Sequence, residues 1–232
     1  MSYSKNDILR KCRDAFGDIK TFYKQPFINY NGKTDDTKEY YTEVIAEFLC
    51  DNITAFIKGI PQITRKETYR TVGHNGVFAA DSPREEEKIA MEMFNQSQRG
   101  LPYDFIGDII DYQTPLKNKR SDVAGKIDLL SYDGRTLYIL ELKKPDSDES
   151  MLRCVLEGFT YMKTVDKVKL LENFNLPVNT IVKASPLVFK NKLQHIQILE
   201  KRLHLLRLMQ LLESKPYYIS KENNIYKVEE SR

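Results

Sequence analysis

Hydrophobic residues recur every three or four positions in several stretches of the chain, which is the spacing of one helix face. This pattern predicts helices over residues 4–15, 37–58 and 191–214, a helix that begins at residue 82, and a helix that follows residues 145–150 and ends near residue 165. The helix over 191–214 is apolar around much of its circumference. It is therefore expected either to be well buried or to form a partner surface.

Stretches rich in β-branched and aromatic residues fall between the expected helices. They predict strands over residues 103–114 and 177–189, and a hairpin over 217–228 that turns at 222–224. Residues 23–36 and 59–80 contain turn-forming residues and predict irregular structure. From residue 82 to residue 189 the expected order is helix, three strands, helix, strand, which indicates an α/β fold with a mixed central sheet flanked by helices.

The second and third of these strands form the expected hairpin over residues 125–144. Two short apolar runs, 127–130 and 137–142, flank Asp133-Gly134, a dipeptide that favours a tight turn with positive φ at both central positions. If these two residues form the turn, Tyr132 lies opposite Arg135. The turn therefore predicts the register of the whole hairpin.

That register gives the hairpin one charged face. It places Asp128 opposite Ile139 and Lys126 opposite Glu141, and Lys143 shares their face because side chains alternate along a strand. Asp128 and Glu141 become diagonal neighbours at roughly 7–8 Å, so their carboxylates can converge on one cation. The other face is apolar and is expected in the core; it carries Leu129, Tyr138, Leu140 and Leu142.

Composition sets the class of the protein. The chain has 232 residues, of which 41% are hydrophobic and 30% charged, a globular balance. We expect one compact unit, with residues 1–80 as a helical extension, 81–190 as the core, and 191–232 as a long helix and a hairpin. The formal net charge of +3 does not by itself indicate or exclude a nucleic acid partner. The long helix would also allow a homodimer.

The cysteines and the N-terminus favour a cytoplasmic protein. Cys12, Cys50 and Cys154 lie far apart without metal-site spacing, which fits buried thiols in a reducing compartment. The chain has no apolar run of transmembrane length and opens without a signal-peptide pattern, so no membrane partner is expected.

The helix that begins at residue 82 carries an acidic candidate. Ser82 is a good N-cap, Pro83 suits the first helical position, and Glu85 completes a capping box. Glu86 precedes the apolar stripe by one turn and lies on its face, with Glu87 nearly as well placed. Acidic residues in a first turn usually complement the helix dipole. A carboxylate on an apolar face also needs a partner such as a metal or a base.

Other polar residues give weaker signals. Arg153, Glu157 and Tyr161 follow one another at four-residue spacing on one face of the helix that ends near residue 165. Asp108 and Asp111, on the first expected strand, are interpreted as surface or turn residues. The histidines show no ligand spacing with each other or with the cysteines; they are His74, His195 and His204.

The hairpin residues resemble the signature of a known family. Asp128 followed by Glu141-Leu142-Lys143 resembles the D…ExK motif of the PD-(D/E)XK nuclease superfamily, and residues 125–128, GKID, look like its frequent G-x-ID strand. The expected helix and strand order matches the αβββαβ core of that family, the restriction-endonuclease-like fold. The resemblance covers residues 82–190 and leaves out the helices at both ends.

The resemblance implies a metal-dependent nuclease that acts on nucleic acid, with DNA as the expected substrate. Mg²⁺ or Mn²⁺ would be held by Asp128, Glu141 and the backbone carbonyl of Leu142, because hard cations prefer oxygen ligands. Lys143 would orient or help to deprotonate the attacking water. By similarity to the family's helix glutamate, Glu86 would hold a metal-bound water or a second ion.

One position departs from the family pattern. Many members carry a Gln followed four residues later by a Tyr, whereas this chain has Glu157 and Tyr161. A glutamate there adds negative charge where phosphate approaches. Two alternatives therefore stay open: an inactive binding or assembly module with the same fold, and a purely structural salt-bridge cluster of Asp128, Glu141 and Lys143.

Overall fold

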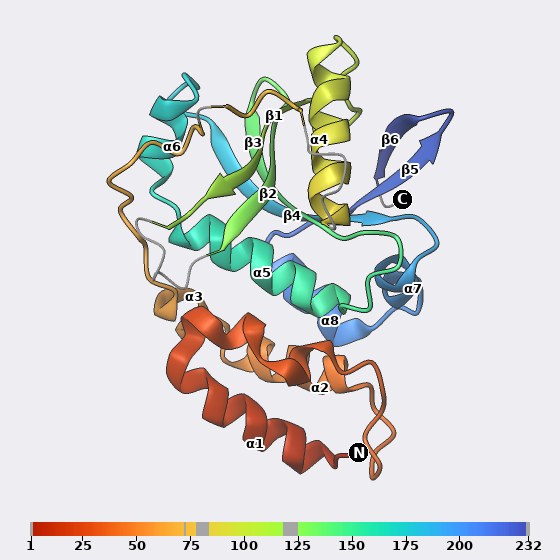
Figure 1. Cartoon of the computed structure of the whole chain (residues 1–232). Helices are drawn as coiled ribbons and strands as arrows, with labels where there is room; N and C mark the ends of the chain where they lie inside the picture. The colour runs from red at the N-terminus through yellow and green to blue at the C-terminus, as the bar shows by residue number, and fades with distance from the viewer. Residues whose placement is uncertain (1, 72, 78–83, 118–124, 231–232) are drawn as a thin grey trace.

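A six-stranded mixed sheet forms the centre of the molecule (Figure 1). The computed structural model describes residues 2–71, 73–77, 84–117 and 125–230. In that part of the chain the sheet order follows the sequence: β1 (Asp108–Pro115), β2 (Lys126–Tyr132), β3 (Thr136–Leu142), β4 (Ile181–Phe189), β5 (Tyr217–Glu222) and β6 (Ile225–Glu230). Strands β3, β4 and β5 run parallel, while the β1-β2, β2-β3 and β5-β6 pairs are antiparallel. The expected α/β fold with a mixed sheet is confirmed.

Helices cover both faces of the sheet. Helix α4 (Glu85–Gln98) packs on one face with Leu129, Leu140 and Leu142, and α5 (Met151–Thr164) packs on the other face, where Leu130 and Ile139 lie. Strand β3 lies between these layers and is buried at every position. Both sides of the hairpin therefore contribute to a core.

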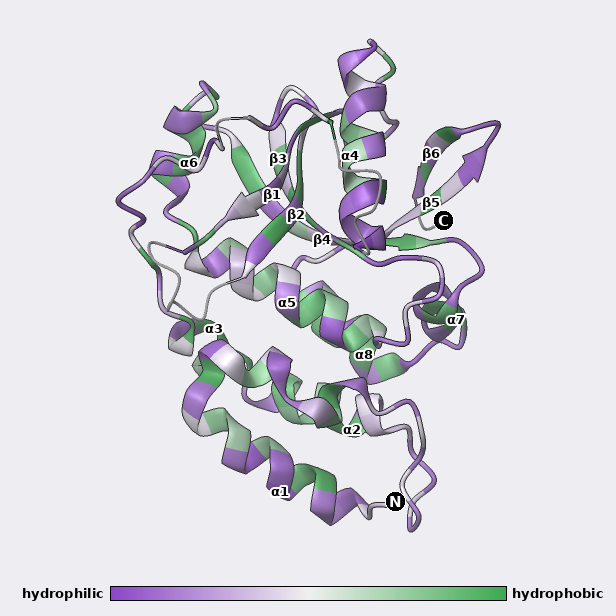
Figure 2. Ribbon diagram, viewed as in Figure 1, coloured by the Kyte–Doolittle hydropathy of each residue, from purple (hydrophilic) through white to green (hydrophobic). Residues whose placement is uncertain are grey.

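The N-terminal segment packs against the outer side of α5. It contains α1 (Lys5–Ala15), the 3₁₀ helices η1 (Phe16–Lys24) and η2 (Pro26–Asn29), α2 (Tyr41–Asp51) and α3 (Ile53–Gly59). Its hydrophobic residues share one cluster with α5 and with α8 (Leu203–Leu211). Figure 2 shows hydrophobic stretches in α2, α5 and α8, whose buried residues belong to this cluster.

Several expected elements are confirmed at close to their expected limits. Ser4 caps α1 in a capping box with Asp7, and the Ser150 hydroxyl accepts from the Arg153 N–H at the start of α5. Strands β5 and β6 turn at Asn223-Asn224, both with positive φ. The order helix, three strands, helix, strand is confirmed from α4 to β4, apart from one additional short helix before β4. The expected cap of α4 at Ser82-Pro83 lies outside the described residues.

The single helix expected over residues 191–214 is wrong. The chain forms α7 (Leu193–Leu199) and α8, separated by Lys201 with a φ of +52°. The Glu43 carboxylate of α2 accepts hydrogen bonds from the N–H groups of His204 and Leu205, at 3.0 and 2.9 Å, and so caps the start of α8. The break lets α7 stay beside α5 while α8 packs against α2.

Smaller differences concern the other expected elements. The helix over 37–58 is divided at Asn52, and the irregular stretch 23–36 contains η2 and the end of η1. Helix α6 (Lys167–Asn173) was not predicted. The three cysteines are buried and free, as expected. Within the described residues, none of the helices is long and apolar enough to cross a membrane.

The hairpin register differs from the expected one by two residues. Tyr132 pairs with Leu137 rather than with Arg135, because Gly134 and Arg135 form the turn and Asp133 donates its N–H to Thr136 O at 3.3 Å. The Asp133 side chain fixes this turn by accepting the N–H groups of Arg135 and Thr136. A shift of two residues keeps every side chain on its expected face.

Asp111 is also placed differently from the expectation. It is 3% exposed rather than a surface residue. Its carboxylate binds His74 Nδ1 at 2.7 Å and accepts from the Thr114 hydroxyl at 2.8 Å. These partners explain why β1, an edge strand, tolerates a buried carboxylate. Asp108 is exposed, as expected.

Candidate active site

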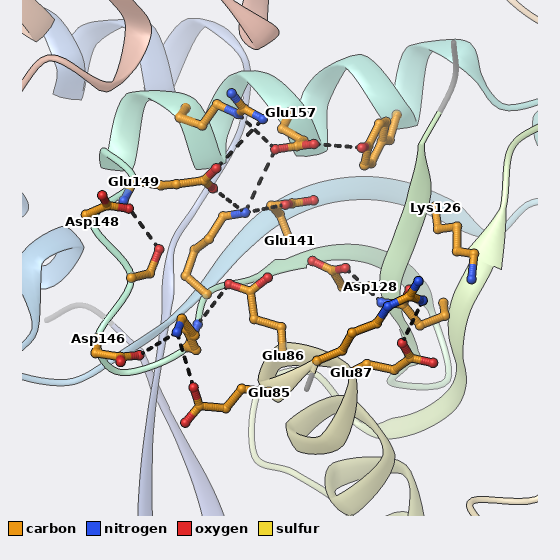
Figure 3. A pocket seen from close by; sticks show the side chains of 17 residues that line it. Glu85, Glu86, Glu87, Lys126, Asp128, Glu141, Asp146, Asp148, Glu149 and Glu157 are labelled. Carbon is orange, nitrogen blue, oxygen red and sulfur yellow. Dashed lines mark hydrogen bonds and ion pairs between the residues drawn. The ribbon is translucent and has the colours of Figure 1, made fainter. Parts of the chain in front are cut away.

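A cleft of about 830 Å³ opens beside the first residues of β2 and the last residues of β3 (Figure 3). The start of α4 and the side of α5 complete its walls. Nine carboxylates line it, from Glu85, Glu86, Glu87, Asp128, Glu141, Asp146, Asp148, Glu149 and Glu157. Five cations accompany them, from Arg84, Lys126, Lys143, Lys144 and Arg153. The excess of negative charge favours the binding of cations.

Asp128 lies half-buried in this cleft. Leu129 pairs with Leu140 and Leu130 with Ile139, so Asp128 does not lie opposite Ile139 as expected; Asp128 and Glu141 are instead the next residues of the two strands beyond the Leu129–Leu140 pair. The Leu142 N–H donates to Asp128 Oδ2, and the Gln113 side-chain amide donates to Oδ1, both at 3.0 Å. Burial, opposed by the charge of Lys143, raises the pKa of Asp128 to about 7.

Glu141 is more deeply buried, at 4% exposure. Burial first, and then the neighbouring carboxylates of Asp128 and Glu157, raise the pKa of Glu141 well above its usual value. The charge of Asp128 thus makes ionisation of Glu141 less favourable. A cation placed between them would relieve this repulsion.

Lys143 is the central cation of the cleft. Its Nζ lies 2.8 Å from Glu141 Oε1, 2.7 Å from Glu149 Oε2 and 3.9 Å from Glu157 Oε2. Burial lowers the pKa of Lys143, but nearby negative charges, that of Glu141 foremost and those of Glu157 and Asp128 among the others, outweigh burial and raise that pKa well above its usual value. The side chain is therefore a charged donor rather than a free base.

The acidic first turn of α4 also faces the cleft (Figure 3). Glu86 Oε1 accepts the Lys144 N–H at 3.2 Å, and its charge contributes to the raised pKa of Asp128. Glu87 pairs instead with Arg84 at 3.2 Å. Of the two glutamates weighed from the sequence, Glu86 is the one whose charge acts on Asp128.

Glu157 and Tyr161 enter the cleft from α5. The Tyr161 hydroxyl donates to Glu157 Oε1 at 2.7 Å, and Arg153 Nε donates to Oε2 at 3.1 Å. Both oxygens of Glu157 are thus engaged. Burial, followed by the charges of Glu141 and Glu157, raises the pKa of Tyr161, so it remains a hydroxyl donor.

Two cleft residues were missed by the sequence reasoning. Gln113 reaches Asp128 from β1 with a φ of +49°, which is unusual for a residue other than glycine. Glu149 reaches Lys143 from the loop before α5. The sequence carries no signal for Gln113, since a bulge between Ile109 and Asp111 sets the strand register. Glu149 follows the ExK motif by six residues, a distance at which a loop can take any direction.

The remaining candidates lie apart from the cleft lining. His74, His195 and His204 are not among its residues. Across the described parts of the chain, no group of three or more His, Cys, Asp or Glu side chains forms a ready metal site. The ligands expected from the sequence are Asp128, Glu141, the backbone carbonyl of Leu142 and Glu86, and the metal they would hold stays a prediction.

Comparison of the chain with models of protein families, with curated proteins and with solved structures found no match. The resemblance to the PD-(D/E)XK superfamily therefore rests on the residues of this chain and on their arrangement.

Proposed function

We propose that the protein is a metal-dependent nuclease that hydrolyses phosphodiester bonds of DNA. The observation that supports this most directly is the grouping of Asp128, Glu141 and Lys143 in one acidic cleft. Two of the three side chains are 4% exposed, and all three interact electrostatically. Burying charged groups this deeply costs free energy on folding, which favours a functional explanation.

The arrangement of elements supports a restriction-endonuclease-like fold for the core. Helix α4 precedes the antiparallel strands β1, β2 and β3, and α5 and α6 lead to β4, which runs parallel to β3. This is the αβββαβ order of the PD-(D/E)XK core with one helix added. The D and ExK residues lie at the matching ends of β2 and β3.

The donor set fits Mg²⁺ or Mn²⁺. Asp128 and Glu141 offer hard carboxylate oxygens, and their mutual repulsion favours a divalent cation nearby. Together with the carbonyl of Leu142 they would hold the ion, with Glu86 as the added carboxylate. The bound ion would lower the pKa of a water and neutralise charge on the phosphodiester.

Other groups of the chain bind the reactants or orient the carboxylate of Asp128. Lys143, kept charged by its carboxylate neighbours, donates hydrogen bonds to the attacking water or to a phosphate oxygen. Gln113 and the Leu142 N–H fix the orientation of the Asp128 carboxylate. Water and phosphate thus meet an oriented set of donors and acceptors.

The test is cleavage of single-stranded DNA, duplex DNA and RNA by the purified protein with Mg²⁺ or Mn²⁺. We expect cleavage by the wild type and a loss of at least about a hundredfold in Asp128→Asn and in Lys143→Ala, because both remove groups that act on the reacting atoms. Asp108→Asn, an exposed change on β1, is the matched control and should cleave normally. A wild type that leaves all three substrates intact would contradict the proposal, as would full activity in Asp128→Asn.

A second candidate is a non-catalytic binding or assembly module. The observation that favours it is the engagement of Lys143 by three carboxylates, which leaves it little freedom to serve a reaction. Calorimetry with Mn²⁺ distinguishes the two functions. Binding that disappears in Asp128→Asn supports the nuclease, whereas no binding, or binding unaffected by that change, supports the module.

A further inference from the structure

Glu157 is held by partners that compensate its charge. Tyr161 donates to one of its oxygens and Arg153 to the other, and Lys143 Nζ lies 3.9 Å away. Arg153 is itself fixed, with an exposed side-chain fraction of 17% and a second contact to Glu149 at 3.8 Å. A bound guanidinium of this kind cancels a carboxylate charge more effectively than a mobile surface lysine does.

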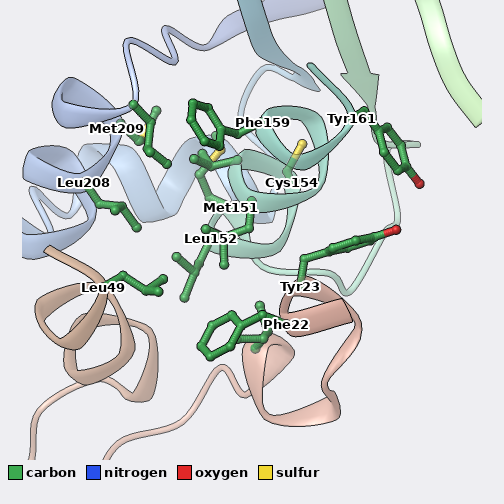
Figure 4. Close-up of a cluster of buried hydrophobic side chains, with 14 of the residues drawn as sticks. Phe22, Tyr23, Leu49, Met151, Leu152, Cys154, Phe159, Tyr161, Leu208 and Met209 are labelled. Carbon is green, nitrogen blue, oxygen red and sulfur yellow. The ribbon is translucent and has the colours of Figure 1, made fainter. Parts of the chain in front are cut away.

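A residue of the N-terminal segment completes this arrangement. Tyr23 of η1 is 2% exposed, and its ring lies under the Arg153 guanidinium at 5.4 Å. The same ring packs edge-on against Tyr161, with centroids 5.8 Å apart; Figure 4 shows the two tyrosines side by side. Tyr23 therefore touches both residues that hold Glu157, by cation–π contact on one side and aromatic contact on the other.

The charges of the inner cleft leave an excess of negative charge for a cation to compensate. Five carboxylates and two cations interact there, which leaves three negative charges: Glu86, Asp128, Glu141, Glu149 and Glu157 against Lys143 and Arg153. Without Arg153 the excess would be four, and a bound Mg²⁺ or Mn²⁺ would leave a more negative site. An approaching phosphate would be repelled by it.

We propose that Arg153 is a positioning residue that neutralises Glu157, and that Tyr23 holds it in place. On this basis a glutamate at position 157 is compatible with a phosphate substrate. The inference rests on the proposed nuclease function. It also assigns a role at the cleft to the N-terminal segment, which the resemblance to the nuclease core does not cover.

The test measures two affinities with opposite expected changes. Mn²⁺ binding is followed by calorimetry, and binding of a duplex oligonucleotide in Ca²⁺ by fluorescence anisotropy. Arg153→Ala should bind Mn²⁺ about tenfold more tightly and the oligonucleotide about tenfold more weakly, because one positive charge near both ligands is lost. The double variant Arg153→Ala with Glu157→Gln restores the charge balance and should return both affinities to near the wild-type values.

Further variants separate charge from packing. Tyr23→Leu should shift both affinities in the same directions as Arg153→Ala, whereas Tyr23→Phe keeps the ring and should bind as the wild type does. Lys163→Ala removes an exposed positive charge from α5 outside the cleft and should leave both affinities unchanged. Circular dichroism checks that each variant is folded.

The outcomes distinguish this inference from the proposed function. A wild type that binds no Mn²⁺ contradicts the nuclease proposal and the inference with it. A different outcome is that the wild type binds Mn²⁺ while Arg153→Ala lowers the affinity for both Mn²⁺ and the oligonucleotide, or changes neither affinity. In that case the charge-neutralising role is wrong while the nuclease proposal stands. Failure of the double variant to recover would also overturn the inference.

Discussion

At the scale of single residues, the cleft keeps carboxylates in surroundings that oppose their charge. Asp128 accepts two hydrogen bonds that favour its ionised form, yet burial outweighs them and its pKa rises to about 7. Gln113, one of the two donors, adopts a left-handed backbone that costs free energy in a strand. Both features lower the stability of the folded state at this position.

This cost can be measured in metal-free buffer. The usual pKa of the Asp128 carboxyl is 3.8, and the folded value is about 7, so between these values the folded state binds more protons than the unfolded state. The free energy of unfolding should therefore fall as pH rises from about 4 to about 7.

Asp128→Asn removes the contribution of Asp128 to this dependence. We expect the variant to be more stable than the wild type by about 1 to 4 kcal/mol at pH 8 and nearly equal to it at pH 4, since one pKa unit corresponds to about 1.4 kcal/mol. Urea denaturation at pH 4, 6 and 8 measures this, with Asp108→Asn as the exposed control. A structural salt-bridge cluster predicts the reverse result, a variant that is less stable at pH 8.

At the scale of elements, contacts between distant segments set where helices and strands begin and end. The hairpin turn is decided locally by Asp133, whose side chain accepts two backbone N–H groups and moves the turn to Gly134-Arg135. The break between α7 and α8 is decided at a distance by Glu43. Arg202, buried at the break, adds a hydrogen bond to Thr42 at 2.8 Å.

The Glu43 contact gives a prediction at this scale. Glu43→Ala should lower the free energy of unfolding by about 1 kcal/mol, because the first N–H groups of α8 lose their acceptor. Asp51→Ala, an exposed change on the same helix, should stay within about 0.5 kcal/mol of the wild type. Equal stabilities of the two variants in urea denaturation would show that the cap contributes nothing.

At the scale of the whole molecule, one hydrophobic cluster joins the N-terminal segment to the sheet. It contains residues of α1 and α2 together with α5, α8 and the inner face of β2 and β3. Figure 4 shows Phe22 and Leu49 from the N-terminal segment beside Leu152 of α5 and Leu208 of α8. Leu199 at the end of α7 and Leu203 at the start of α8 remain exposed, and the expected homodimer stays a prediction.

The shared cluster predicts cooperative unfolding. Ile45→Ala, a change of a fully buried residue in α2, should cost about 2 to 5 kcal/mol and increase hydrogen exchange in β3 as well as in α2. An increase confined to α1, α2 and α3 would show instead that the N-terminal segment unfolds on its own. Val77→Ala, at an exposed position, is the control.

The sequence by itself determined the type and order of most elements and the face of each hairpin residue. Periodicity specifies which side chains share a face, and a register error of two residues leaves that face unchanged. For this reason Asp128, Glu141 and Lys143 could be grouped in advance although their pairing was wrong. Glu86, Glu157 and Tyr161 followed from helical spacing in the same way.

Only the tertiary structure decided which partners the charged groups of the cleft have. Gln113 reaches Asp128 through a bulge and a left-handed residue, Glu149 reaches Lys143 from a loop, and Tyr23 reaches Arg153 from a segment more than a hundred residues away. Loop directions and packing between distant segments leave no periodic trace in a sequence, because they depend on which surfaces meet once the elements have formed.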